Sequence, residues 1–339
     1  MIVLFLELAG FIYYHDSGKD NKKIRIAMPD PPSGKNRKRY RDFKSYLREK
    51  FGCSVYKLQI DAGFTCPNRD GTLATGGCIY CDGRGSALRQ RGPLPAVAAQ
   101  LAKSKELYRK LRGAKKYIAY FQTFTNTYGP FEKLKALYEE ALAQKDVIGL
   151  AVGTRPDCIS DEVITLLDGY GRDSHVWVEY GLQSAHDKTL HYINRGHDYR
   201  AFTEAVERTA GKNILICTHI IAGLPGETRD DILETARRLA ALPIQGIKIH
   251  LALALEGTVM GRLFREGNIS LMTKEEYVNT VCDILEVLPP DMVIQRLTAD
   301  GYRDIYLAPD WGRNKMQVLN AIECELERRD TFQGAKFRP

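Results

Sequence analysis

Short apolar runs alternate with longer amphipathic segments from residue 55 onward. The runs are rich in β-branched and aromatic residues and predict strands, whereas the longer segments predict helices. Strands are expected at Val55–Ile60, Tyr117–Phe121, Val147–Val152, Val176–Tyr180, Ile214–Ile220 and Ile247–Leu251, and helices at Pro95–Leu111, Phe131–Gln144, Asp161–Gly169, Tyr199–Ala210 and Asp230–Ala241. This order is typical of an α/β fold with a parallel sheet.

Six strands in this rhythm favour a partial (β/α)6 barrel of the TIM type over a doubly wound sheet. No Gly-x-Gly-x-x-Gly follows the first strand, so a dinucleotide site is unsupported. Barrels of this type place their chemistry at the carboxyl ends of the strands. Here those ends are polar or rich in glycine, at a cysteine loop, 122–127, 153–157, 181–184, 219–227 and 250–258. We therefore expect the functional site at this rim.

The pattern divides the chain into three parts, residues 1–39, 40–270 and 271–339. The first part begins with an apolar stretch that lacks a basic start, contains Glu7 and is shorter than the ~20 residues that span a bilayer. We interpret it as a poorly ordered tail with a linker at 29–36, and expect no membrane partner. The last part predicts a small α/β extension, with helices at Thr273–Leu288 and Lys315–Arg329 and a strand at Val293–Leu297.

Three cysteines, Cys66, Cys78 and Cys81, lie in the glycine-rich loop 61–90. A four-iron cluster held by three thiolates keeps one iron open for a small molecule. Gly76 and Gly77 allow the positive φ angles that wrapping such a cluster requires. Structural zinc is the competing interpretation, but it prefers four ligands, and no second close pair is present. A loop of inert reduced thiols is the third.

The other five cysteines are scattered singly, and we interpret them as buried small apolar residues: Cys53, Cys158, Cys217, Cys282 and Cys324. Eight cysteines without evenly spaced pairs do not indicate an extracellular disulfide framework. A reducing cytoplasm is the expected location. The length of 339 residues and the 44% of hydrophobic positions permit one large domain with an appendage.

The formal net charge is +7, and a dense basic run starts at Lys35 and includes Arg37, Lys38 and Arg39. Basic side chains interleaved with aromatic ones suit a polyanion such as RNA. A solvated helix face explains the same run equally well. Charge alone leaves both interpretations open.

Taken together, the cysteine loop and the strand-end motifs resemble radical S-adenosylmethionine (SAM) enzymes. The resemblance is to the branch that includes the Elongator catalytic subunit and the YhcC/YtqA-type proteins. It covers about residues 40–335 and rests on segments 63–71, 77–81, 154–157, 179–184, 194–197 and 223–226. The long spacing from Cys66 to Cys78 departs from the commonest radical SAM pattern but is typical of this branch. The acetyltransferase domain of the Elongator subunit has no counterpart in this sequence.

This resemblance implies a radical SAM barrel in which Cys66, Cys78 and Cys81 hold a [4Fe–4S] cluster whose open iron binds SAM. The remaining SAM contacts that it implies are Tyr80, Gln122, Asn126, Thr154, Arg155, Gln183, Gly223 and Pro225. Two of them have a purely structural alternative. Tyr80 could be a packing residue, and Arg155 could form an ion pair with Asp157 or Glu179.

The implied activity is reductive cleavage of SAM to a 5′-deoxyadenosyl radical, with the electron from a flavodoxin or ferredoxin type of donor. The substrate that the resemblance implies is the wobble uridine of tRNA, with a 5-carboxymethylaminomethyl side chain trimmed towards aminomethyl. A radical SAM enzyme acting on a small metabolite, in cofactor or porphyrin synthesis, is one alternative. A non-catalytic RNA-binding protein that holds zinc is the other. No residue is assigned to the substrate chemistry.

Overall fold

The computed structural model describes residues 38–83, 85, 93–299 and 304–338, together with the backbone of two short strands, β1 (Phe11–Tyr13) and β2 (Lys23–Arg25). The predicted linker at 29–36, Arg37 and most of the predicted tail lie outside the described residues.

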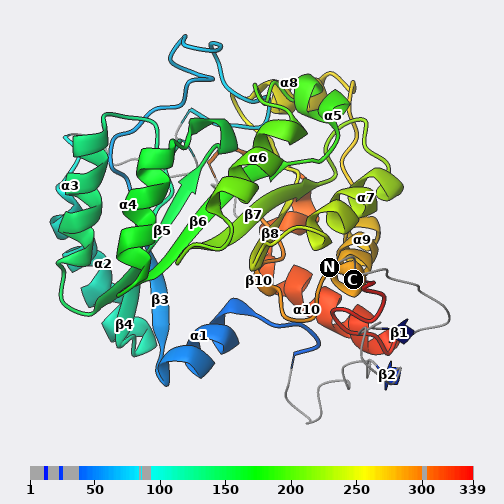
Figure 1. Ribbon diagram of the computed structural model, residues 1–339. Helices are drawn as coiled ribbons and strands as arrows, with labels where there is room; N and C mark the ends of the chain where they lie inside the picture. The colour runs from blue at the N-terminus through cyan, green and yellow to red at the C-terminus, as the bar shows by residue number, and fades with distance from the viewer. Residues whose placement is uncertain are drawn as a thin grey trace.

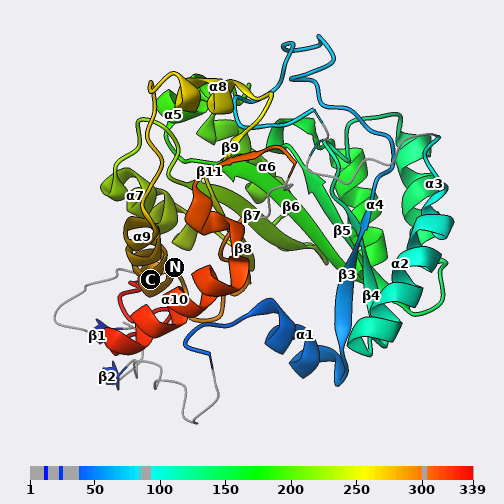
Figure 2. The ribbon, with the colours of Figure 1, turned by 180° about the vertical axis from the view of Figure 1, so that it is seen from behind.

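A parallel, curved sheet of seven strands forms the centre of the molecule (Figures 1 and 2). Its spatial order is β10-β8-β7-β6-β5-β4-β3, the order of an open half-barrel. The strands are β3 (Val55–Ile60), β4 (Lys116–Phe121), β5 (Val147–Thr154), β6 (His175–Gln183), β7 (Leu215–Ala222), β8 (Gly246–Leu251) and β10 (Val293–Arg296). The predicted partial barrel is therefore confirmed, with one strand more than expected.

Helices cover the outer face of this sheet (Figure 1). They are α2 (Val97–Arg112), α3 (Phe131–Leu142), α4 (Asp161–Gly171), α6 (Tyr199–Thr209), α7 (Arg229–Ala240) and α9 (Lys274–Val287). Several begin where a side-chain oxygen accepts a backbone N–H of the first turn, as Ser160 does for α4 and Thr273 for α9. The predicted helix starts lie within two residues of the observed ones, both where such a cap is present and in α2 and α3, which have no side-chain cap.

The shortest elements escaped prediction, because they contain too few residues to show a period. They are α5 (Asp187–Tyr192), α8 (Val259–Arg265), β9 (Ala254–Leu255), β11 (Tyr306–Ala308) and two 3-10 turns, Pro156–Cys158 and Asp310–Arg313.

The seventh strand comes from the segment predicted as a separate extension. β10 pairs in parallel with β8, with Val293 opposite Gly246 and Ile294 opposite Ile247. Helix α10 (Lys315–Arg328) packs on α9, and Tyr277 and Ile322 belong to the same buried cluster as the sheet. The boundary at residue 270 stays a prediction, but the chain on its two sides shares one hydrophobic core.

Helix α1 (Phe43–Phe51) closes the barrel at the end opposite the cysteine loop (Figure 1). The rings of Phe43 and Tyr46 meet the buried ring of Trp177 edge-on, with centroids 6.0 and 6.1 Å apart. Asp42 caps the helix by accepting the backbone N–H groups of Lys44 and Ser45. Aromatic side chains of α1 therefore cover the end of the barrel opposite the cysteine loop.

Two of the five isolated cysteines, Cys217 and Cys282, are buried, as predicted. Cys53 and Cys158 are only half-buried and Cys324 is exposed, so the prediction of burial is wrong for Cys324 and holds only in part for Cys53 and Cys158. It lies on α10, where a small side chain is tolerated at a solvent-facing position. None of the described helices is both long and apolar enough to cross a bilayer.

Candidate active site

A cavity of about 500 Å³ lies at the carboxyl ends of the strands. Its lining brings together eight of the residues predicted for the site: Cys66, Cys78, Tyr80, Cys81, Gln122, Thr154, Arg155 and Gln183. These residues come from four stretches of the chain that are distant in sequence. The barrel rim was predicted to carry the chemistry, and most of the predicted side chains meet there.

The cysteine loop follows β3 and folds back on itself. Gly76 and Gly77 have φ angles of +88° and +82°, the left-handed region that the sequence predicted for them. A side chain at position 77 would also place its Cβ 2.7 Å from Nη1 of Arg69. The backbone N–H of Cys81 donates to the carbonyl of Cys78 at 2.9 Å, which forms a tight turn between the two thiols.

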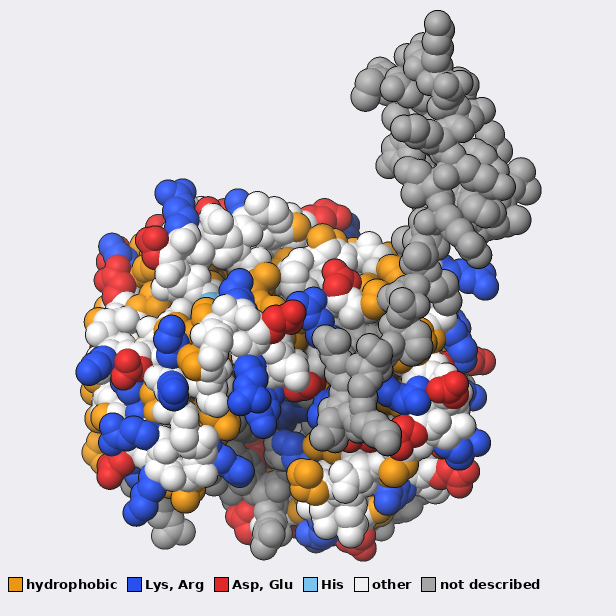
Figure 3. Space-filling model, turned by 90° about the horizontal axis from the view of Figure 1, so that it is seen from below, with side chains coloured by type: hydrophobic (Ala, Val, Ile, Leu, Met, Phe, Trp, Pro, Cys, Tyr) orange, Lys and Arg blue, Asp and Glu red, His pale blue; other side chains and the backbone are white. Residues whose placement is uncertain are grey.

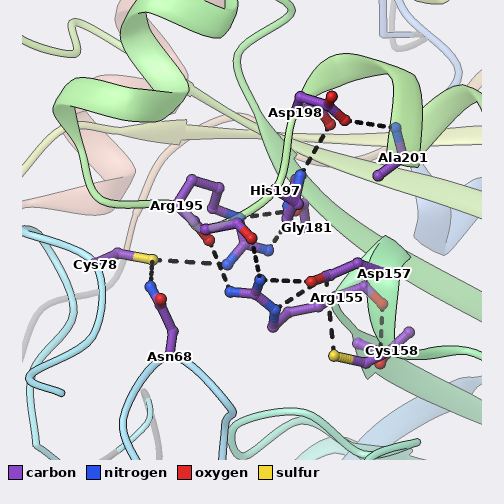
Figure 4. A network of polar contacts seen from close by, with 12 residues as sticks. Asn68, Cys78, Arg155, Asp157, Cys158, Gly181, Arg195, His197, Asp198 and Ala201 are labelled. Atoms are coloured by element: carbon purple, nitrogen blue, oxygen red, sulfur yellow. Dashed lines mark hydrogen bonds and ion pairs between the residues drawn. The ribbon is translucent and has the colours of Figure 1, made fainter. Parts of the chain in front are cut away.

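Two buried side chains direct N–H groups at the sulfur of Cys78 (Figure 4). Arg195 Nη1 lies 3.7 Å and Asn68 Nδ2 lies 3.6 Å from Cys78 Sγ. Arg195 is anchored by donating from Nε to the Gly181 carbonyl at 3.2 Å. The sequence placed Arg195 in a family segment without a role, because nothing local links it to a cysteine 117 positions away. N–H donors of this kind tune the electronic properties of a ligating sulfur.

Arg155 is buried and forms the ion pair with Asp157 that the sequence left as an alternative. Its Nε and Nη2 atoms donate to the two carboxylate oxygens at 3.0 and 2.7 Å, a bidentate arrangement. Nη1 donates to the backbone carbonyl of Arg195 at 2.7 Å (Figure 4). Arg155 therefore fixes the position of Arg195, and its predicted contact with SAM stays a prediction.

Three of the predicted residues line the cavity and are held in place locally: Thr154, Gln122 and Gln183. Thr154 Oγ1 lies 2.6 Å from Thr127 Oγ1, and Gln122 Oε1 accepts from Gln59 Nε2 at 2.6 Å. Gln183 has a φ of +85°, which costs a non-glycine residue conformational energy and often marks a functional position.

Three predicted cofactor contacts do not lie on this cavity. Asn126 is fully buried behind it, where Nδ2 donates to the Gly153 carbonyl at 2.9 Å. Gly223 faces Met272, whose sulfur would lie 3.0 Å from a Cβ at that position. Pro225 lines a separate surface pocket. Their contact with SAM stays a prediction.

A cluster of charged and polar side chains, here called the ionic floor, lies at the inner end of the cavity: Lys57, Tyr120, Glu179, His219 and Lys248. All of them except Lys57 line the cavity. Glu179 is fully buried and accepts hydrogen bonds from Lys57, from Lys248 and, at 2.9 Å, from His219 Nε2. Lys248 also donates to the Tyr120 hydroxyl at 2.8 Å. Neither lysine was predicted from the sequence as a site residue. The feature of the sequence that could have revealed them is a charged residue inside a strand that is otherwise mostly apolar.

Burial and mutual attraction set the protonation of the ionic floor. Burial by itself raises the pKa of Glu179, but the charges of Lys248 and Lys57 and the hydrogen bond from His219 outweigh it and hold that pKa well below its usual value. Burial lowers the pKa of Lys248 to about 8 and that of His219 to about 4. The carboxylate is therefore ionised and the imidazole neutral at physiological pH.

Two sequence models match this chain. Residues 68–239 match the Radical SAM superfamily, and residues 244–328 match the Radical_SAM C-terminal domain. The chain belongs to the radical SAM superfamily.

Its relatives confirm the branch suggested by the sequence motifs. YtqA of Bacillus subtilis is 42% identical over 307 residues, which cover 91% of this chain and 95% of YtqA. YhcC of Escherichia coli is 36% identical over 88% of this chain and 95% of YhcC. The tRNA uridine(34) acetyltransferase of Dehalococcoides mccartyi is 27% identical, over 51% of this chain and 37% of that protein.

The solved structure of the archaeal Methanocaldococcus infernus Elp3 superposes with a TM-score of 0.59 at 16% identity, over 82% of this chain and 64% of that one. At this identity the likeness shows the fold alone. It supports the half-barrel as the radical SAM fold.

Radical SAM enzymes use a [4Fe–4S] cluster and SAM, so the predicted cofactors are confirmed and the zinc interpretation is set aside. The residues present fit the cluster, because three thiols line one cavity and the sulfur of Cys78 receives two N–H groups. Burial raises the pKa of Cys81 to about 12, and a bound metal favours the thiolate that burial disfavours. In the described part of the chain, no three His, Cys, Asp or Glu side chains converge on a point where a single ion would bind.

Of the residues predicted to contact RNA, Lys38 and Arg39 are described, and neither lines this cavity. Lys38 forms an ion pair with Glu323 at 3.1 Å, and Arg39 forms one with Asp330 at 3.1 Å. Both contacts join the start of the described chain to its C-terminal part. On the face seen from below, where α1 lies, Lys and Arg side chains are interspersed with acidic ones (Figure 3). RNA binding by residues 37–39 stays a prediction.

Proposed function

We propose that this radical SAM enzyme modifies the wobble uridine of tRNA and trims a 5-carboxymethylaminomethyl side chain towards aminomethyl. The observation that carries the proposal is the similarity of half the chain to a protein named tRNA uridine(34) acetyltransferase. The fold shared with an archaeal Elp3 agrees with it. The trimming reaction itself comes from the resemblance to the YtqA-type proteins.

When bound, the cluster and SAM supply a 5′-deoxyadenosyl radical that removes hydrogen from a substrate carbon. The chain's own residues position these groups and keep water out. Arg195 and Asn68 orient Cys78, and the pair of Arg155 with Asp157 holds Arg195 in place. The apolar side chains of Ile221, Leu251, Leu253 and Leu255 line the same cavity. A dry cavity limits side reactions of a radical.

The experiment that tests the proposal compares the wobble-uridine nucleosides of cells with and without this protein by mass spectrometry. We expect 5-carboxymethylaminomethyluridine to accumulate and 5-aminomethyluridine to fall in its absence. Complementation with the wild-type gene restores the product, and complementation with Cys78→Ala does not. Cys324→Ala, which removes an exposed thiol away from the cavity, is the matched control and restores it.

A purified enzyme, loaded with cluster and SAM and given a flavodoxin or ferredoxin as the proposed donor, provides the second measurement. Formation of 5′-deoxyadenosine that increases with tRNA supports the proposal. Unchanged nucleosides in cells, together with SAM cleavage that ignores tRNA, would instead indicate a small-metabolite substrate.

A further inference from the structure

The ionic floor holds more positive than negative charge. Glu179 is the carboxylate that both Lys57 and Lys248 contact, and all three side chains are largely withdrawn from solvent. His219 and His250 add no charge, because burial lowers both pKa values. Within this group, one positive charge is left uncompensated. A buried charge without a partner is costly, so an anion at this point would stabilise the site.

The two lysines differ in their access to the cavity. Lys57 does not line it, and its Nζ donates to Gln295 Oε1 at 2.6 Å and faces the rings of Phe43 and Tyr120. Lys248 does line the cavity. Glu179 and Tyr120 accept two of its three N–H groups in the described structure, and the third is available to a ligand. The uncompensated charge therefore belongs to Lys248.

Two imidazoles line the same cavity as this ammonium. The rings of His219 and His250 lie 5.3 Å apart, and both line the cavity. A neutral imidazole carries one N–H donor, so His250 offers a hydrogen bond without adding charge. Arg296 lines the cavity as well and takes part in interactions of its own, and its positive charge contributes to lowering the pKa of Lys248 and of both histidines.

We propose that the ionic floor, with His250, is a carboxylate-binding subsite for the substrate. The one charge left over within the ionic floor matches an anion of single charge, such as a carboxylate. The inference rests on the proposed function, because the 5-carboxymethylaminomethyl side chain ends in a carboxylate and its aminomethyl product does not. Lys248 and His250 bind the carboxylate, and Glu179 is a positioning residue that holds Lys248. The subsite thereby distinguishes substrate from product.

The test measures binding without reductant, so that no turnover occurs. Fluorescent anticodon stem-loop RNAs carry either the 5-carboxymethylaminomethyl group or its methyl ester, and the protein is loaded with cluster and SAM. We expect the wild type to bind the acid about tenfold more tightly than the ester, the size of one hydrogen bond to a charged group. Lys248→Met abolishes this preference and Lys248→Arg keeps it. Lys110→Met, on the exposed face of α2, behaves as wild type.

Lys248→Met is expected to fold, because it leaves Glu179 paired with Lys57 and removes the uncompensated charge. Equal affinity of the wild type for acid and ester, or an unchanged preference in Lys248→Met, would overturn the subsite.

A measurement without RNA separates this inference from the proposed function. N-methylglycine reproduces the end of the side chain, and we expect it to raise the melting temperature of the wild type but not of Lys248→Met. Its methyl ester has no effect on either. If the wobble nucleosides of cells do not change while N-methylglycine still raises the melting temperature, the proposed tRNA function is wrong and the subsite binds another carboxylate substrate. If the tRNA side chain is trimmed but neither the preference for the acid nor the melting temperature depends on Lys248, the subsite is wrong and the proposed function is supported.

Discussion

The guanidinium of Arg195 is predicted to raise the reduction potential of the cluster that Cys78 is predicted to hold. Replacing Arg195 with Gln removes a buried positive charge whose nearest nitrogen is 3.7 Å from the sulfur. Reduction adds one negative charge to the cluster. With roughly 6 Å between that charge and the guanidinium and an effective dielectric constant of about 20, their attraction is about 2.8 kcal/mol. For a one-electron step this corresponds to about 120 mV.

Asp157, whose charge acts on Arg195, is present in both proteins, so its own field on the cluster cancels in the comparison. Stronger screening, with an effective dielectric constant of about 40, would halve the attraction, and we therefore expect the midpoint potential of Arg195→Gln to be about 60–120 mV more negative than that of the wild type. The assay is a redox titration followed by electron paramagnetic resonance, on reconstituted protein without SAM or substrate. Arg195→Lys keeps the charge and serves as the control. An unchanged midpoint in Arg195→Gln, at full iron and sulfide content, refutes the electrostatic role.

Three further predictions concern the ionic floor, the cysteine loop and the basic segment. Glu179→Gln leaves two buried lysines without their carboxylate and lowers the free energy of unfolding in urea by about 3–5 kcal/mol. Because the pKa of Glu179 is lowered by folding, its contribution is present above the unfolded pKa of about 4.3 and disappears as the pH falls through the folded pKa. Gly77→Ala forces a Cβ against Arg69 at a positive φ and reduces the iron bound per chain. Alanine at all of residues 37–39 weakens tRNA binding and flattens its salt dependence without changing SAM binding.

Each of these predictions has a control in the same chain. Glu204→Gln, in an exposed ion pair on α6, changes the stability by less than about 1 kcal/mol. Gly83→Ala lies in the same loop but has neither a positive φ nor a close contact, and it retains iron. Glu323→Ala with Asp330→Ala breaks the same ion pairs as the basic variant while adding positive charge. If both of these charge variants lose tRNA affinity equally, the lost ion pairs explain the effect and the basic side chains do not contact RNA.

The strand and helix pattern and the cysteine loop were accessible from the sequence because both are local. Alternation of apolar runs reports which face of an element is buried, and the six predicted strands all occur within a few residues of their expected positions. Three cysteines and two glycines lie within one loop, and their spacing alone indicates a cluster-binding site. Strand ends of a parallel sheet meet at one rim, which placed most of the predicted residues on one cavity.

Tertiary structure alone decided which side chains meet across the barrel. Lys57, Glu179 and Lys248 lie on three different strands, and their contact depends on the register and curvature of the sheet. Arg195 reaches Cys78 for the same reason. The periodicity of a sequence predicts that a residue faces inward. It does not identify the residue that this side chain contacts, because that contact depends on how distant segments pack. The sequence therefore determined the fold and the cluster loop, and packing determined the charge of the cavity and the residues that bear on Cys78.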